Sequence, residues 1–115
     1  MEIMNSIYSI IVALIFNCMD LLTGIIAGIR MRDIQSSKLR DGLFKKVGFL
    51  FCYFLGWLVD TQGYRIGFNV KNILPIIILY ACTTELVSII ENIYKINPDL
   101  SPDKLMSIFH IKKDK

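Results

Sequence analysis

The chain has few of the residues that catalytic, metal or disulfide sites require. It contains one histidine, His110, and three cysteines that lie far apart in the sequence, Cys18, Cys52 and Cys82. This spacing provides neither a metal-ligand set nor a disulfide framework, so we expect the cysteines to be small, buried apolar side chains. The chain also lacks a Ser/His set, an acid pair and a Gly-rich phosphate loop. These absences argue against an enzyme and against a bound cofactor or metal.

Charge is scarce in three long apolar segments, although the loops between them are well charged. Of the 115 residues 54% are hydrophobic and the mean hydropathy is +0.52, whereas about 45–50% apolar residues is usual. The net charge of +3 is modest, and no basic surface with interleaved aromatic residues indicates a nucleic acid partner. Glu2 stands where a signal peptide has basic residues, so we expect the first segment to be retained. The sequence predicts an all-α integral membrane protein, with residues 1–115 in one domain.

The first predicted span covers residues 7–29, which carry a single charge, Asp20. At about 1.5 Å per residue, this helix is long enough to cross a hydrocarbon core of about 30 Å. Asn5 or Ser6 is the expected helix cap.

The second predicted span covers residues 43–59, and its charge-free part is short. It reaches the length of a span only if Lys45 and Lys46 snorkel toward the headgroups. We expect its helix to begin in the preceding linker, with Ser36 and Ser37 as candidate caps.

The third predicted span covers residues 73–94, with Asn72 as its cap and Pro75 in its first turn. The Asn97-Pro98 pair is expected to end this helix. In the tail, residues 95–115, Ser101 and Pro102 begin a short amphipathic helix. Its apolar face is expected to lie on the membrane surface, and it consists of Leu105, Ile108 and Phe109.

The linker between the first two spans is the most basic part of the chain. Residues 30–46 hold six basic and two acidic side chains, a net charge of +4, whereas the loop at 60–72 has a net charge of +1. The positive-inside rule therefore places the linker in the cytoplasm, with the N-terminus outside and the C-terminus, including Lys112, Lys113 and Lys115, inside. The basic side chains of the linker are Arg30, Arg32, Lys38, Arg40, Lys45 and Lys46.

Two acids inside the spans, Asp20 and Glu85, are the sharpest candidates for function. Intramembrane carboxylates usually face a partner or a water-filled path, and Thr23 and Ser88 lie about one turn away from them. Lys45 and Lys46 are candidate counter-charges, although their default is to snorkel outward. The alternative is that each acid is protonated or satisfied locally and only holds the helices together.

Small residues form two candidate helix-packing stripes. Gly24 and Gly28 lie one turn apart in the first span, and Gly48 and Gly56 lie eight residues apart near one face of the second. Small residues let helices approach closely in lipid, so we expect the first span to hold a homo-oligomer together. Such glycine pairs are also frequent by chance in apolar segments.

Three stretches together resemble the toxin-secretion and phage-lysis holin family, over about residues 17–106. They are Asp20-Leu-Leu-Thr23-Gly24, then Ser37 followed by Arg40-Asp41-Gly42-Leu-Phe-Lys45-Lys46, and Glu85-Leu-Val-Ser88-Ile-Ile-Glu91-Asn92. The resemblance implies a small multi-span protein that oligomerises in the bacterial cytoplasmic membrane. It further implies lesions that release an endolysin or a toxin without a signal peptide. The rival hypothesis is a regulatory membrane protein that forms no pore, such as an antiholin or an accessory subunit.

Overall fold

The computed structural model describes residues 3–110, and in this range it contains helices and no strands. The helices are α1 (Ile3–Met31), α2 (Ser36–Gln62), the short 3₁₀ helix η1 (Gly63–Ile66), α3 (Ile73–Ile96) and α4 (Pro102–His110). Helices α1, α2 and α3 are each long and apolar enough to cross a membrane. The predicted fold class, three membrane-spanning helices and a short C-terminal helix, is therefore confirmed.

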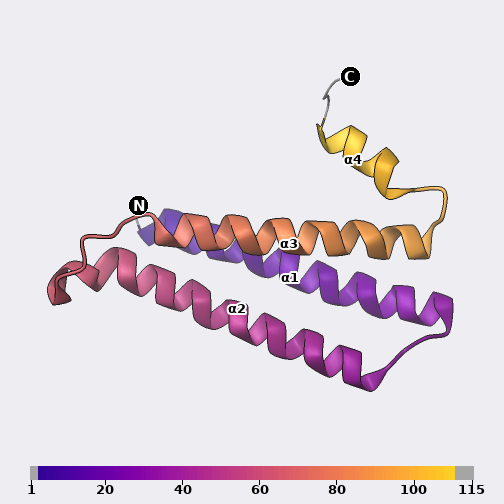
Figure 1. The fold of residues 1–115 in the computed structure, drawn as a ribbon, viewed down its shortest axis with the longest axis horizontal. Helices are drawn as coiled ribbons and strands as arrows, with labels where there is room; N and C mark the ends of the chain where they lie inside the picture. The colour runs from indigo at the N-terminus through magenta and orange to yellow at the C-terminus, as the bar shows by residue number, and fades with distance from the viewer. Residues whose placement is uncertain (1–2, 111–115) are drawn as a thin grey trace.

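The three long helices are packed unevenly. Helices α1 and α3 lie side by side along most of their length, and α2 packs mainly against α3 (Figure 1). Toward its own N-terminus α2 diverges from both neighbours. Helix α4 extends past the C-terminal end of α3 and contacts only α3 within the described part of the chain. The bundle is therefore tight at one end of α2 and open at the other.

A small core joins the helices at the tight end. Ala13, Tyr53, Leu74 and Ala81 are fully buried there. Gly56 lets α2 approach α3, because a β-carbon at this position would lie only 3.2 Å from the Cα of Leu74. Large apolar side chains elsewhere on the three helices remain exposed, which suits lipid as the surrounding solvent. The partly buried apolar residues around the core are Ile10, Leu14, Phe49, Trp57, Ile77, Ile78 and Cys82.

The helices are longer than the predicted spans at most of their ends. As expected, α2 begins in the basic linker, so it reaches well beyond residues 43–59. The Asn97-Pro98 pair ends α3, and Pro75 lies in its first turn, both as predicted. The tail residues Lys112, Lys113 and Lys115 and the side chains of Phe109 and His110 lie outside the described part of the structure, as does Glu2.

Three predicted helix caps are wrong. Asn72 has a left-handed backbone, with φ of 64°, and makes no capping hydrogen bond through its side chain. The acceptor at the start of α3 is instead Asp60, whose two carboxylate oxygens accept hydrogen bonds from the backbone N–H groups of Ile73 and Leu74, at 2.9 and 2.8 Å. A carboxylate near a helix N-terminus satisfies unpaired amides and favours the helix dipole.

The other wrong caps lie inside their helices. Helix α1 already includes Asn5 and Ser6, and α2 starts at Ser36 after Gln35, whose side chain makes no capping bond. The predicted cap of the tail helix is confirmed, because the hydroxyl of Ser101 accepts a hydrogen bond from the Lys104 N–H at 3.3 Å.

The cysteine prediction is correct in bonding and wrong in burial. All three cysteines are free thiols. Cys18 and Cys52 are exposed and Cys82 is half-buried, because the first two lie on helix faces that point away from the small core.

Candidate functional site

One charged side chain from each long helix meets near the middle of the bundle. Asp20 lies on α1, Lys46 on α2 and Glu85 on α3. The Nζ atom of Lys46 is 2.8 Å from Oδ2 of Asp20 and 3.4 Å from Oε2 of Glu85. A single ammonium therefore joins two carboxylates that are far apart in the sequence. We call Asp20, Lys46 and Glu85 the charged triad.

The helical register of α2 turns Lys46 inward. Lys46, Phe49, Tyr53 and Gly56 recur at intervals of three or four residues, so they share one face of the helix. Tyr53 and Gly56 are buried on this face, which fixes the rotation of α2 about its axis. Lys45 points away and is exposed. Of the two lysines, only Lys46 therefore serves as the counter-charge.

Buried polar side chains complete the coordination of Glu85. The amide nitrogen of Asn17 donates a hydrogen bond to Oε2 of Glu85, and the Tyr53 hydroxyl donates to Oδ1 of Asn17 at 2.9 Å. Glu85 is 3% exposed, Asn17 5% and Tyr53 1%. Because buried polar groups are costly when unpaired, this chain of hydrogen bonds explains how a carboxylate is accommodated between apolar helices.

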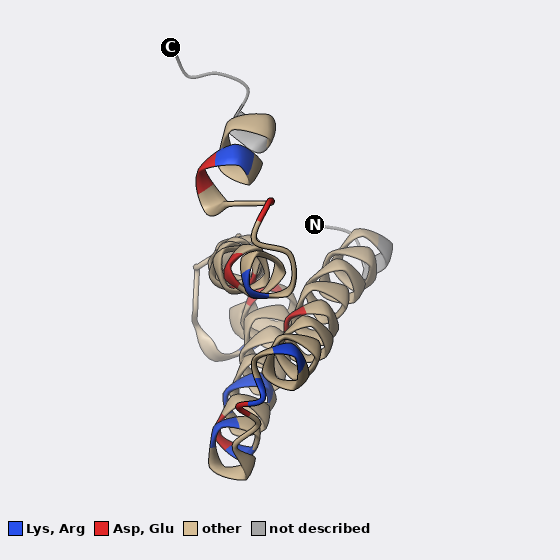
Figure 2. Cartoon of the chain, turned by 90° about the vertical axis from the view of Figure 1, so that its right-hand side faces the viewer, with Lys and Arg blue, Asp and Glu red and all other residues tan. Residues whose placement is uncertain are grey.

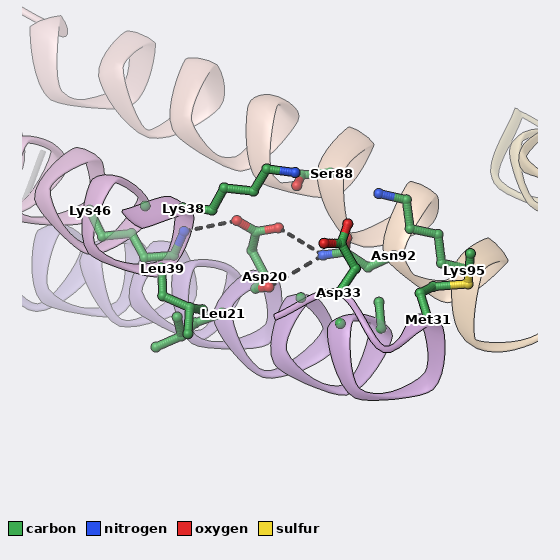
Figure 3. Close-up of a pocket in the computed structure, with 14 residues that line it drawn as sticks. Asp20, Leu21, Met31, Asp33, Lys38, Leu39, Lys46, Ser88, Asn92 and Lys95 are labelled. Carbon is green, nitrogen blue, oxygen red and sulfur yellow. Dashed lines mark hydrogen bonds and ion pairs between the residues drawn. The ribbon is translucent and has the colours of Figure 1, made fainter. Parts of the chain in front are cut away.

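Asp20 is held from the other side by Asn92 of α3. The Asn92 amide nitrogen donates to Oδ1 of Asp20 at 3.2 Å (Figure 3). It also donates to the Thr23 hydroxyl at 3.0 Å. Gly24 faces this amide, and a β-carbon there would lie 3.6 Å from its nitrogen, which is an ordinary van der Waals contact. The polar positions of the first and third spans that sequence analysis singled out are thus in contact within one chain.

The triad carries one positive and two negative formal charges. Removing Lys46 would leave two carboxylates without their shared counter-charge, a change that costs several kcal/mol in proteins, whereas removing one acid would leave a neutral ion pair. Its chemistry is structural and electrostatic: it ties three helices together by charge. Among residues 3–110, no group of three or more His, Cys, Asp and Glu side chains is arranged to hold a metal ion.

The remaining predicted residues are spread over the surface near the triad. Ser88 lines a cavity beside Asp20, whereas Asp41 and Glu91 are exposed. Gly28 lies against Ile34 of the following loop, and a β-carbon at Gly42 or Gly48 would meet nothing within 4 Å. The exposed basic residues of the linker are Arg30, Arg32, Lys38, Arg40 and Lys45.

Tyr53 and Asp60 were not among the residues predicted from the sequence. Tyr53 lies seven residues after Lys46, a spacing that puts both on one helix face, so this spacing was the available signal. Asp60 caps a helix 13 residues further along the chain, a distance at which no local pattern points to it.

These features define a multi-pass membrane protein whose helices enclose a charged triad. The model of the bacteriophage holin family matches residues 3–114, nearly the whole chain. The protein therefore belongs to the bacteriophage holin family, as its sequence resemblance indicated. No curated protein and no solved structure matches the chain.

Proposed function

We propose that this chain acts as a holin: it oligomerises in the bacterial cytoplasmic membrane and forms lesions that release an endolysin or a toxin lacking a signal peptide. The observation that carries the proposal is the charged triad inside the spans of a member of the bacteriophage holin family. Ionised groups are costly in lipid and inexpensive in water. A state in which Asp20, Glu85, Thr23 and Ser88 face a water-filled lesion relieves this cost.

Oligomerisation is supported by the surfaces that the single chain leaves open. Gly24 and Gly28 already lie against Asn92 and Ile34 of the same chain. Gly48 has no neighbour within 4 Å, so its face of α2 is open to close approach by another helix. We therefore propose that a second copy contacts the face of α2 that carries Gly48, and that it also contacts α1. Replacing Gly48 by Leu should then reduce crosslinked oligomers in membranes, and unchanged oligomers would remove this face from the interface.

The proposed orientation places the linker at 30–46 and the C-terminus in the cytoplasm and the N-terminus outside. The linker's net charge of +4 is the support for it. Single cysteines introduced at Lys38 and Ile66 test it, in a variant whose three native cysteines are replaced. An impermeant thiol reagent added to intact cells should label position 66 and spare position 38, and the reverse pattern would overturn the orientation.

Induced expression in a bacterium tests the lytic function. A holin stops growth abruptly and collapses the membrane potential. Continued growth with a normal potential would contradict the proposal and favour the alternative, a regulatory or accessory membrane protein that forms no pore.

Acid variants then test the role of the triad in this activity. Asp20→Leu and Glu85→Leu should delay or abolish lysis, whereas Asp20→Asn and Glu85→Gln should change its timing less because they keep hydrogen-bonding capacity. The measurement is the time from induction to loss of turbidity, with membrane levels checked by immunoblot. If both Leu variants accumulate normally and lyse on the wild-type schedule, the acids do not line the lesion.

A further inference from the structure

A cavity opens where the C-terminal ends of α1 and α3 face the N-terminal part of α2. Its volume is about 380 Å³, and α1, α2, α3 and the loop after α1 all contribute to its wall. Leu21, Ala27 and Leu39 provide apolar parts of this wall. The residues that line the cavity come from the region where α2 diverges from α1 and α3 (Figure 1).

Three lysines and two aspartates line this cavity, which gives it a net formal charge of +1. Lys46 and Asp20 are already paired in the charged triad, and Asp33 accepts a hydrogen bond from Gln35 at 3.1 Å. Lys38 and Lys95 are different, because neither has a carboxylate within 4 Å among the described residues. In Figure 3 their side chains extend from α2 and α3 toward the same cavity. The cavity therefore presents two ammonium groups that are free to bind an anion.

We expect the end of the cavity at Lys38 and Lys95, beyond the charged triad, to lie at the depth of the headgroups. Lys and Arg residues are concentrated at this end of α1, α2 and α3, alongside Asp and Glu residues, as Figure 2 shows looking onto it. Such side chains mark the membrane–water interface of a spanning helix. Exposed apolar side chains, including Leu22 and Ile26 of α1 and Leu43 of α2, continue from this end toward the membrane interior. An anionic lipid fits this arrangement, because its headgroup can contact the lysines of the cavity while its acyl chains contact the exposed apolar side chains.

We propose that this cavity binds the phosphate of an anionic phospholipid such as phosphatidylglycerol, with Lys38 and Lys95 as its two cationic ligands. Basic pockets between spanning helices are known to suit such headgroups. The net charge of +1 matches one phosphodiester. The lipid would join the start of α2 to the end of α3, where direct packing is weakest. This inference depends on membrane insertion and not on lesion formation.

Native mass spectrometry of the full-length chain in micelles tests the site, with dioleoyl phosphatidylglycerol or dioleoyl phosphatidylcholine added at known concentrations. Wild type should bind phosphatidylglycerol more tightly than phosphatidylcholine. At about fivefold per lysine, Lys38→Gln with Lys95→Gln should weaken phosphatidylglycerol binding about thirtyfold. The matched control, Lys45→Gln with Lys104→Gln, removes the same charge from exposed positions outside the cavity and should leave the affinity unchanged.

Two further experiments distinguish loss of the lipid ligands from loss of the fold, and a lipid site from a site for free phosphate. Lys38→Arg with Lys95→Arg should keep phosphatidylglycerol binding, since guanidinium groups also bind phosphate, and it shows that the Gln variant loses ligands rather than the fold. Inorganic phosphate at millimolar concentration should fail to displace the lipid. Equal affinity for both lipids, an equal loss in the control variant, or displacement by inorganic phosphate would each overturn the proposal.

Discussion

Removing Lys46 is the sharpest test of the charged triad, because among the described residues it is the only cation that Asp20 and Glu85 share. Lys46→Met keeps the length and apolar stem of the side chain and removes its ammonium. Two carboxylates then face each other between α1 and α3, where Glu85 is 3% exposed. The variant should destabilise the association of the three helices without shortening any of them.

The size of the effect follows from the burial of the triad. Breaking a buried ion pair by deleting one partner costs about 3–5 kcal/mol. The Lys46 and Asp20 side chains are each 15% exposed, so the pair is not completely buried and the lower end of this range applies. We therefore expect a loss of about 3 kcal/mol, which corresponds to roughly a hundredfold change in the ratio of packed to unpacked chains.

Titration with SDS in mixed micelles measures this loss, followed by the fluorescence of Trp57, the single tryptophan of the chain. Trp57 packs against the core that joins α2 to α1 and α3, so its emission reports their separation. Lys45→Met is the matched control: it is adjacent on α2, exposed, and should shift stability by less than about 0.5 kcal/mol. Equal midpoints for Lys46→Met and Lys45→Met would refute the view that the triad holds the helices together.

Two further predictions concern packing and capping. Gly56→Leu should separate α2 from α3, because even a β-carbon at this position lies 2.8 Å from Cδ1 of Ile77; a disulfide engineered between the two helices should form less readily, whereas Gly48→Leu should leave its yield unchanged. Asp60→Ala should lower stability by about 1–2 kcal/mol in the SDS titration, since the first two amides of α3 lose their acceptor, and an unchanged midpoint would mean that water replaces the carboxylate.

The three long helices were predictable because their signal is local. Each apolar run is continuous in the sequence, and a chain in lipid must satisfy its backbone hydrogen bonds within each spanning segment. The ends of these helices were less predictable. The start of α2 in the charged linker was predicted, because charge at an interface does not interrupt backbone hydrogen bonding, but the capping residues at the starts of α1, α2 and α3 were not.

The contacts between helices were only partly predictable. Asp20 and Glu85 stood out because acids are rare in spans, but the sequence contains nothing that distinguishes Lys45 from Lys46 as their partner. Packing of Tyr53 and Gly56 against the other helices makes that choice by fixing the rotation of α2. The cap of α3 also depends on tertiary structure and not on local sequence, since Asp60 reaches Ile73 only after the chain has turned through η1.

The charged triad also limits how the helices can rearrange. Lys46 is compensated only while α2 remains beside α1 and α3, since both of its carboxylate partners lie on those helices. If α2 moved away into lipid, all three charges would lose their partners in a medium that solvates none of them. The helix rearrangements that avoid this cost are those that bring the triad into water or against polar groups of another copy. The triad thereby disfavours a rearrangement in which α2 alone leaves its neighbours within lipid.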